Sequence, residues 1–532
     1  MVLKTSEQPS SMSRLSASPG PLLALSIAVL VTLGMQLYLW PHVTDDAYIT
    51  FRYAYHLASG EGPVFNPGER VEGFSNPLWT LSLGGLFALT GIPLPDLARG
   101  IGLLCTLGTL VILFLIYRRF LPFAGEAPFY LSLFFLLITP GFHVYATAGL
   151  EGPLLSLLLL SGVFLSLSPS RHSYVAALLF GLAGITRPEG PLYAFLWFLA
   201  TIGDAGTRRE MLRKELPRLV VMLFPIIAWQ IFRLSYYGAW IPNTAVAKIS
   251  GVFGEFISFP DYIAPWIAAL GGPLAILVWI FLPPSEPAVR RLERIALATV
   301  GGTLVFVAYA RGDWMNFGRF IVPVWPLVAV IFPLWLFSGL QRVTASAELR
   351  FKRGFRIVPF LAVLLCAYFA WYSSIEEYVG NEKMNMLMRG TDQIVVGNWI
   401  NENITPEATI ATGRLGGIGF GAMKNTIWDW FGLTDAEEAR FIRAGRPGTI
   451  ADDPVFRRKP DVIAAIEAPA DWSYKQTIQL MKYLENDYLY VIGFPQGMYG
   501  YVDIWIRKER LQDVFVTRTE YVLPSEKGKQ GD

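Results

Sequence analysis

Two adjacent carboxylates follow the first apolar run of this 532-residue chain. The run LLALSIAVLVTLGMQLYLW covers residues 22–40, and Asp45 and Asp46 come directly after PHVT. A carboxylate at the edge of a membrane can act as a general base on a substrate hydroxyl held there. An acidic pair behind a helix can also be a simple solvated cap, so the pair needs support from other parts of the chain.

Further charged residues are expected on the same side of the membrane as the acidic pair. Carboxylates and cations together suit one scheme, in which a sugar leaves a lipid phosphate and is transferred to an acceptor hydroxyl. The carboxylate would accept the hydroxyl proton, and the cations would neutralise the charge that builds on the phosphate. The residues concerned are Asp45, Asp46, Arg52, Glu151, Arg187, Glu189, Lys248, Arg311, Asp313 and Arg319.

Each of these residues also has a plainer interpretation. The segment ITFRYAYHL can form a helix whose aromatic residues lie on the headgroups and whose polar edge, with Arg52 and His56, faces solvent. Glu151 can interact with a helix dipole, and Arg187 can pair with Glu189 alone. Their shared location on one side of the membrane therefore supports the hypothesis of a catalytic site more strongly than any single residue does.

The composition places these residues on a polytopic α-helical membrane protein. The chain is 53% hydrophobic and only 16% charged, whereas soluble domains are about one quarter charged. Lipid excludes open sheets, and the short alternating segments of a β-barrel are absent from the sequence. The net charge of +2 gives no indication of nucleic-acid binding. Cys105, Cys366 and the four histidines show no metal-ligand spacing, although a divalent cation at the Asp45/Asp46 pair stays open.

About eleven membrane segments are expected, each near the 20 residues that a bilayer requires. Residues 1–21 read as a disordered cytoplasmic tail, and the first run is too long for a signal-peptide core. Residues 22–373 form the membrane domain, with 41–76 as its first external loop. The clear segments are 22–40, 97–117, 127–147, 151–168, 216–235, 263–283, 295–310, 318–338 and 355–373, and the ambiguous ones are 77–92 and 173–203.

The basic clusters at residues 208–218, 290–294 and 342–356 orient the chain, because such clusters favour the cytoplasm. Residues 173–203 are too long for one span and carry TRPEGP at their centre, so we favour a hairpin there. The hairpin puts Glu151, Arg187 and Glu189 on the side of the acidic pair. The alternative is that each apolar block forms one span, which places Glu151 on the opposite side of the membrane from the acidic pair.

Residues 374–532 change in character and predict an extracytoplasmic α/β domain. TDQIVVGNWINENI and YKQTIQLMKYLEN read as helices, and ATIAT, DVIAAI, YLYVIGF and YVDIWIRK read as strands. The run GRLGGIGFGA lacks the spacing of a phosphate loop and is interpreted as a turn that allows close backbone packing. Contact of this run with a ligand is the alternative.

The stretch TDDAYITFRYA followed by VFNPGERVEGFSNPLW resembles the first external loop of GT-C glycosyltransferases that use lipid-phosphate sugars. More narrowly, it is similar to the terminal β-(1→2)-arabinofuranosyltransferases of the actinobacterial cell wall and their bacterial relatives. Further motifs resemble that group in the same order: AGLEGPLLSLLL (148–159), ITRPEGPLY (185–193), YYGAWIPNTAVAK (236–248), RGDWMNFGRFIVPVWPL (311–327) and IWDWFGLTD (427–435).

The resemblance implies a GT-C fold and an inverting, polyprenyl-phosphate-dependent transferase in a bacterial inner membrane, with its active site outside. Asp45 or Asp46 would be the general base, with Asp45 preferred. The candidates for donor phosphate or sugar contact are Arg52, Glu151, Arg187, Glu189, Asn243, Lys248, Asp313 and Arg319. Arabinofuranose is one candidate sugar, and the acceptor would be a cell-envelope glycan, a lipopolysaccharide or a surface protein.

A lipid-linked glycan ligase or polymerase and a non-enzymatic lipid-sugar flippase are the alternatives. The chain departs from the family pattern at RGDWMNFGRF, where a Pro-Gly turn is expected after the Met, and in its shorter C-terminal region.

Overall fold

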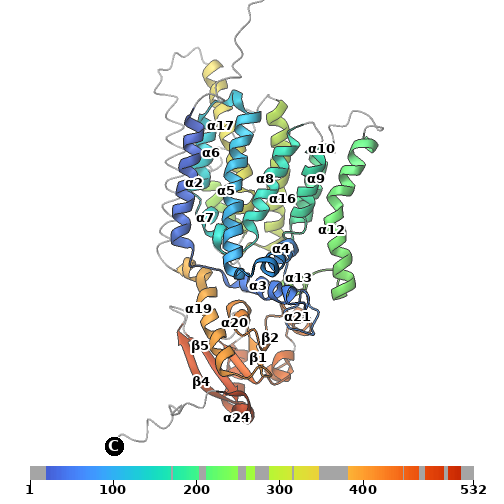
Figure 1. The fold of residues 1–532 in the computed structure, drawn as a ribbon, viewed down its shortest axis with the longest axis vertical. Helices are drawn as coiled ribbons and strands as arrows, with labels where there is room; N and C mark the ends of the chain where they lie inside the picture. The colour runs from blue at the N-terminus through green and yellow to red at the C-terminus, as the bar shows by residue number, and fades with distance from the viewer. Residues whose placement is uncertain are drawn as a thin grey trace, which may run out of the picture.

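The computed structural model describes residues 19–168, 172–202, 211–249, 259–269, 287–313, 315, 317–346, 382–446, 448–465, 474–495 and 501–516. Helices form an upright bundle, and an α/β unit lies against one end of it (Figure 1). The predicted tail 1–21 lies almost entirely outside the described residues, as does the predicted span 355–373.

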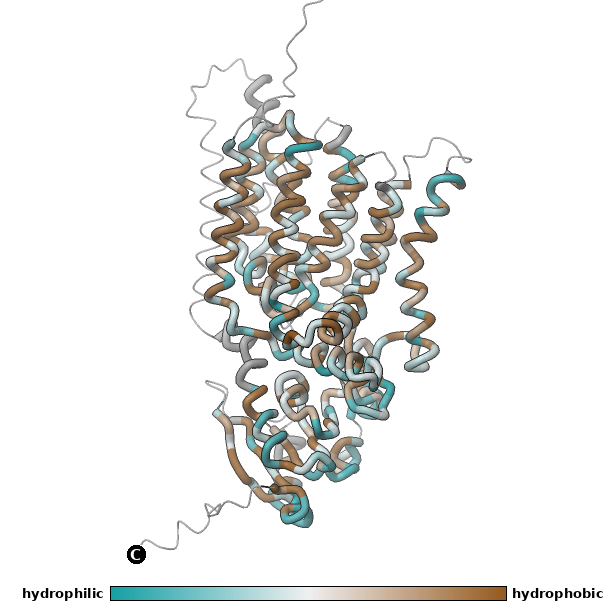
Figure 2. Tube along the Cα trace, viewed as in Figure 1, coloured by the Kyte–Doolittle hydropathy of each residue, from teal (hydrophilic) through white to brown (hydrophobic). Residues whose placement is uncertain are grey.

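Long apolar helices make up the first half of the bundle. α2 (Gly20–Leu39), α5 (Leu94–Phe120) and α8 (Gly152–Ser166) follow the predicted apolar runs, and α4 (Pro77–Thr90) occupies the ambiguous segment 77–92. Leu25 of α2, Leu113 of α5 and Leu159 of α8 belong to one hydrophobic core. Trp79 and Leu83 of α4 belong to a second one. Apolar colour runs along the middle of these helices and polar colour gathers at their ends (Figure 2).

The predicted hairpin in 173–203 is present. α9 (His172–Ala183) and α10 (Gly190–Ile202) are separated by turns. The two helices meet closely at Gly190, where an added Cβ would lie 2.0 Å from the Ala183 carbonyl oxygen. The glycine therefore permits the tight reversal at TRPEGP.

The predicted span 127–147 is not one continuous helix, because the chain forms two helices there. α6 (Ala127–Leu137) and α7 (Pro140–Thr147) meet at an angle of 60°. Pro140 has no N–H for the helical ladder, and Thr139 before it takes an extended conformation with ψ 109°. The break turns α7 toward the α/β end of the bundle (Figure 1).

The second half of the bundle contains α12 (Leu216–Tyr237), α14 (Phe259–Ala269), α16 (Pro287–Ala310) and α17 (Trp325–Ser346). Residues 270–283 of the predicted span 263–283 lie outside the described residues. Within the described ranges, four helices are long and apolar enough to cross a membrane, or five if the bent pair counts as one span. The total of eleven segments stays a prediction.

The α/β unit is built on a five-stranded sheet in the order β2-β1-β3-β5-β4. β1 (Thr409–Thr412), β2 (Thr426–Asp429) and β3 (Val462–Ala465) are parallel, whereas β4 (Tyr488–Pro495) and β5 (Tyr501–Arg507) form an antiparallel pair beside β3. The four predicted strand segments correspond to β1, β3, β4 and β5, and β2 was not predicted. The helices of the unit are α19 (Glu382–Asn403), α20 (Leu415–Gly421), α21 (Ala436–Arg443), α22 (Pro454–Arg457), α23 (Tyr474–Asp487) and α24 (Leu511–Val514).

Residues 415–421 of the glycine-rich run form helix α20 rather than the predicted turn. α20 packs against both α19 and the short helix α3 (Asp45–Ala58) of the loop 41–76. The predicted close packing is present, since an added Cβ at Gly416 or Gly397 would lie within 2.5 Å of neighbouring backbone oxygens. Glycine is therefore needed here for proximity between helices.

Candidate active site

The acidic pair forms the first turn of α3, immediately after α2 ends. The chain leaves α2 through Pro41 and is fixed by a hydrogen bond of 3.1 Å from the Thr44 amide to the Ala148 carbonyl. Acidic side chains are favoured in the first turn because the helix dipole is positive there. α3 is longer than the headgroup-lying helix considered for ITFRYAYHL, and it is buried between the bundle and the α/β unit.

Asp45 contacts the α/β unit directly. Its Oδ1 accepts a hydrogen bond of 2.7 Å from the Gly417 amide of α20. Burial raises the pKa of the Asp45 carboxyl to about 6, an effect that the nearby Asp46 increases and the Gly417 hydrogen bond opposes. The Asp45 side chain is half-buried, and the Gly416 amide also favours its ionised form. Asp45 is thus a carboxylate that α20 fixes in place and that keeps partial exposure to solvent.

Asp46 pairs with Arg319, which also binds Asp313. Arg319 Nη1 lies 3.1 Å from Asp46 Oδ2, and its Nη2 and Nε bind the two Asp313 oxygens at 2.7 and 3.0 Å. Arg319 follows a turn in which Phe317 and Gly318 both have positive φ angles, of 62° and 70°. The chain therefore makes a left-handed turn at 317–318 without the expected Pro-Gly sequence.

Arg187 forms a second cluster of the same kind. Its Nη1 lies 2.9 Å from Glu151 Oε1, and its Nε lies 2.5 Å from Glu189 Oε1. Asn76 donates to the other Glu151 oxygen at 2.8 Å. All three charged side chains are buried, so the prediction that they share one side of the bundle is confirmed, and the single-span alternative is wrong. Arg187 therefore does not pair with Glu189 alone.

Phe320 joins the two clusters. The guanidinium of Arg187 lies 5.1 Å from the centre of its ring and that of Arg319 lies 5.2 Å away. Both distances allow cation–π attraction. The ring therefore sits between two arginines, each of which binds two carboxylates.

Lys248 and Asn243 lie on the short helix α13 (Asn243–Ile249). The Lys248 side chain reaches solvent, but the protein around it and the charge of Arg319 lower its pKa, while Asp46 and Asp313 oppose that effect. Lys248 is thus electrostatically part of the Arg319 cluster. Asn243 instead donates to the carbonyls of Gly432 and Leu433, at 2.7 and 3.0 Å, and ties α13 to the α/β unit.

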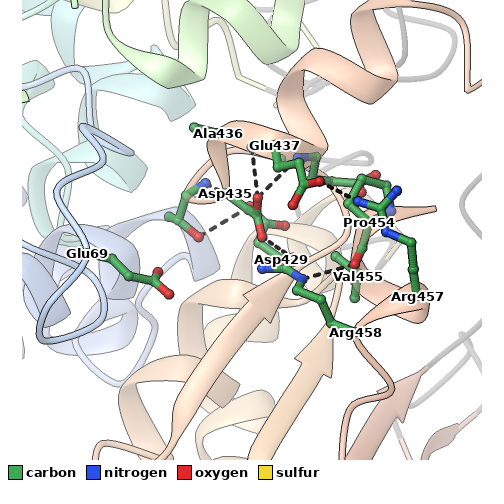
Figure 3. A network of polar contacts seen from close by, with 12 residues as sticks. Glu69, Asp429, Asp435, Ala436, Glu437, Pro454, Val455, Arg457 and Arg458 are labelled. Carbon is green, nitrogen blue, oxygen red and sulfur yellow. Dashed lines mark hydrogen bonds and ion pairs between the residues drawn. The ribbon is translucent and has the colours of Figure 1, made fainter. Parts of the chain in front are cut away.

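The loop whose carbonyls accept the Asn243 hydrogen bonds belongs to the motif IWDWFGLTD. Asp429 accepts hydrogen bonds from the Phe431 and Thr434 amides, and Asp435 caps α21 through the Glu437 and Glu438 amides. Figure 3 shows Asp435 at the centre of this network, with Arg458 binding its carboxylate. These contacts fix the loop against which α13 rests.

Arg52 has a different position from the one expected for a donor ligand. The side chain is fully buried, and all five of its N–H groups bind protein acceptors. Three of these acceptors are the carbonyls of Gly419, Ala422 and Asn425 in the α/β unit. Arg52 therefore joins the loop 41–76 to that unit, and we interpret it as a structural residue.

Sequence reasoning missed four contributors to this site: Asn76, Phe320, Gly417 and Arg414. Asn76 and Phe320 stand inside quoted motifs, so their motif membership could have identified them. Gly417 and Arg414 act through contacts with a residue about 370 positions away, for which the local pattern gives no signal.

A divalent cation at the Asp45/Asp46 pair stays a prediction. Mg²⁺ usually keeps several waters in proteins and is bound by one or two carboxylates together with substrate phosphates. One oxygen of Asp46 is held by Arg319 and one of Asp45 by Gly417. Across the described ranges, no group of three or more His, Cys, Asp or Glu side chains could hold a metal ion.

The chain is similar to two curated terminal β-(1→2)-arabinofuranosyltransferases. It is 28% identical to that of Corynebacterium glutamicum over 386 residues, which cover 62% of this chain and 53% of the relative. It is 33% identical to that of Mycobacterium tuberculosis over 351 residues, which cover 58% and 54%. The chain thus aligns with about half the length of each relative. Residues 384–514 match a family described as a domain of unknown function, DUF8728.

Solved structures show the fold. ArnT from Cupriavidus metallidurans, bound to undecaprenyl phosphate, superimposes with a TM-score of 0.55 at 14% identity, over 92% of this chain and 98% of that one. AglB from Archaeoglobus fulgidus, with an inhibitory peptide and a dolichol-phosphate, gives 0.51 at 13% identity, over 91% and 74%. The chain is a helical membrane protein with the GT-C fold.

Proposed function

We propose that this chain is an inverting glycosyltransferase that moves a sugar from a polyprenyl phosphate to an acceptor hydroxyl. The observation that carries the proposal is the position of Asp45, a half-buried carboxylate that the Gly417 amide holds next to the Asp46–Arg319 pair. The sequence relatives are glycosyltransferases, and solved proteins of the same fold hold polyprenyl or dolichol phosphates.

In the proposed reaction Asp45 accepts the proton of the acceptor hydroxyl. The hydroxyl oxygen attacks the anomeric carbon of the sugar, and the bond between that carbon and the phosphate oxygen breaks. Its electron pair stays on the phosphate, and the lipid phosphate leaves. A raised pKa suits this role, because a base works best when its pKa lies near the working pH.

The surrounding residues would prepare the site for this step. Arg319 orients Asp46 and presents positive charge beside it, and Lys248 adds a solvent-accessible cation. The buried Glu151–Arg187–Glu189 cluster holds the ring of Phe320, next to Arg319 in the sequence. Developing charge on the phosphate would then meet preorganised cations.

We further propose that the site and the α/β unit, assigned to residues 374–532, face the outside of a bacterial inner membrane. Arg118 and Arg119 end α5 at its far end from α3, and Arg290, Arg291 and Arg294 begin α16, whose other end leads to Asp313. Positive residues favour the cytoplasmic side, which would put the site outside. The acceptor would be an envelope glycan, a lipopolysaccharide or a surface protein.

Single-turnover transfer in proteoliposomes tests the proposal. Radiolabelled polyprenyl-phosphate arabinofuranose is offered in parallel with other lipid-phosphate pentoses and hexoses, with and without a chelator. We expect label on an acceptor with the wild type, and a loss of about 10²–10⁴-fold for Asp45→Asn. Asp487→Asn, which changes an exposed carboxylate on α23, is the matched control.

Two results would oppose the proposal. Label that crosses the bilayer equally well with wild type and Asp45→Asn, without reaching any acceptor, would indicate a lipid-sugar carrier. Transfer only of preassembled glycans from diphosphate-linked lipids would indicate a ligase or polymerase. Loss of activity with a chelator would show that transfer needs a divalent cation.

A further inference from the structure

The two buried arginines of the site are already neutralised by carboxylates. Arg319 binds Asp313 and Asp46, and Arg187 binds Glu151 and Glu189. An incoming phosphate would have to compete with two carboxylates at each guanidinium. A donor phosphate is therefore expected to need at least one cation that has no carboxylate partner.

Arg414 is such a cation. It follows β1 after a single glycine and precedes α20, and its amide donates to Thr412 Oγ1 at 3.0 Å, which fixes its backbone. The side chain is half-buried. Among the described residues its guanidinium has no hydrogen bond or ion pair, in contrast to Arg187 and Arg319.

The backbone next to Arg414 touches the proposed base. Two residues later, an added Cβ at Gly416 would lie 1.9 Å from the Asp45 carbonyl oxygen, and Gly417 donates to the Asp45 carboxylate. The positive charge of Arg414 lies close enough to lower the pKa of Asp45 against the effect of burial. Arg414 is therefore at the edge of the same site, although it belongs to the α/β unit.

The sheet topology points to the same location. β1 has parallel neighbours on both sides, β2 and β3, and the chain runs from β1 to β2 on one side before it reaches β3 on the other. In open parallel sheets, ligands bind beyond the carboxyl ends of the strands at such a reversal of order. Arg414 follows the carboxyl end of β1, and α20 after it lies between the sheet and α3 (Figure 1).

We propose that Arg414 binds the phosphate of the lipid donor, so that the domain of unknown function at residues 384–514 completes the active site. The inference rests on the proposed function and adds a ligand from outside the helical bundle. A guanidinium suits the role because its planar N–H groups bind phosphate in a bidentate manner and stay charged. Docking of the domain would then be a condition for donor binding.

Binding of undecaprenyl phosphate, which carries no sugar, tests the inference separately from transfer. The full-length protein is titrated with this lipid in detergent micelles, as wild type, Arg414→Gln, Arg414→Lys and Arg443→Gln. Arg443 is an exposed arginine on α21 and serves as the matched control. We expect Arg414→Gln to weaken binding at least tenfold, Arg414→Lys to recover part of it, and Arg443→Gln to bind like the wild type.

The outcomes separate the two proposals. If the wild type transfers sugar and Arg414→Gln binds the lipid as tightly as wild type, the inference is overturned and the transferase stands. If no donor is used but Arg414→Gln still loses lipid affinity, the phosphate ligand stands and the transferase fails. A variant whose only change is a higher pH for half-maximal transfer would show that Arg414 acts solely through Asp45, and would also overturn the inference. Equal melting temperatures exclude misfolding as the cause of a loss.

Discussion

Replacing Asp45 by Asn should stabilise the folded protein while it lowers transfer about 10²–10⁴-fold. The folded-state pKa of Asp45 is raised from 3.8 to about 6, so the ionised carboxylate is less favourable in the folded than in the unfolded chain at neutral pH. Two pKa units correspond to about 3 kcal/mol, since one unit is about 1.4 kcal/mol. The side chain is partly exposed, which reduces the expected gain to about 1–2 kcal/mol. Asn keeps an oxygen that can accept the Gly417 hydrogen bond.

The pH dependence distinguishes this effect from a general change in packing. Above pH 6 the wild-type carboxyl is ionised in both states, and the folded protein carries the full penalty. As the pH falls through 6 toward 3.8, the folded protein binds the proton first and the penalty disappears. The advantage of Asp45→Asn should therefore be largest at pH 7.5 and small near pH 4.

Thermal unfolding in detergent, followed at pH 7.5, 6 and 4.5, measures the effect, and Asp46→Asn provides the contrast. Asp46 pairs with Arg319 at 3.1 Å, so its replacement removes an ion pair and should lower stability by about 0.2–1 kcal/mol. Opposite signs for two neighbouring Asp→Asn changes would support the assignment of Asp45. A melting temperature for Asp45→Asn that equals the wild type at all three pH values would refute the reasoning.

Three more predictions follow from the contacts of this site. Arg52→Met should cost at least about 3 kcal/mol, because it removes the Arg52 hydrogen bonds to four backbone carbonyls at a buried position. Limited proteolysis should then release the fragment near residues 382–516 faster, and unchanged melting and digestion would contradict this. Gly416→Ala should lower the rate of transfer far more than Gly85→Ala. An added Cβ at Gly416 would meet the Asp45 carbonyl, whereas one at Gly85 would meet nothing within 4 Å, and equal rates for the two variants would oppose this prediction. The rate of transfer should fall about tenfold per pH unit below about 6, because only the ionised Asp45 can accept a proton, and a flat profile from pH 4.5 to 8 would argue against Asp45 as the base.

The sequence predicted those features that depend on local composition. Apolar length located α2, α5, α8 and α12, and the residues Pro188 and Gly190 marked the reversal between α9 and α10. The same reasoning placed Glu151, Arg187 and Glu189 together, because a hairpin changes which end of each helix carries them. The break at Pro140 was missed, although a proline within an apolar run is a recognised signal for it.

Features that depend on contacts between distant segments were not predictable from one sequence. A surface helix with Arg52 on its polar edge has the same local pattern as a buried helix whose arginine is satisfied by distant carbonyls. The acceptors of Arg52 at Gly419, Ala422 and Asn425 lie about 370 residues away. Likewise, a run with five glycines fits a turn locally, and only the close approach of α19 and α3 gives it a reason to be a helix.

These distant contacts bear on the role of residues 384–514. The domain meets the membrane part through the Arg52 acceptors at 419–425, the Gly417 amide on Asp45, and the loop 432–435 that binds Asn243 at the start of the helix carrying Lys248. One of these contacts holds the proposed base, and another holds the helix of a proposed cation. A domain that only recognised an acceptor would not need to contact both the proposed base and the helix that carries Lys248. Its position is better explained if the site between α3, α13 and α20 forms only when the domain is docked.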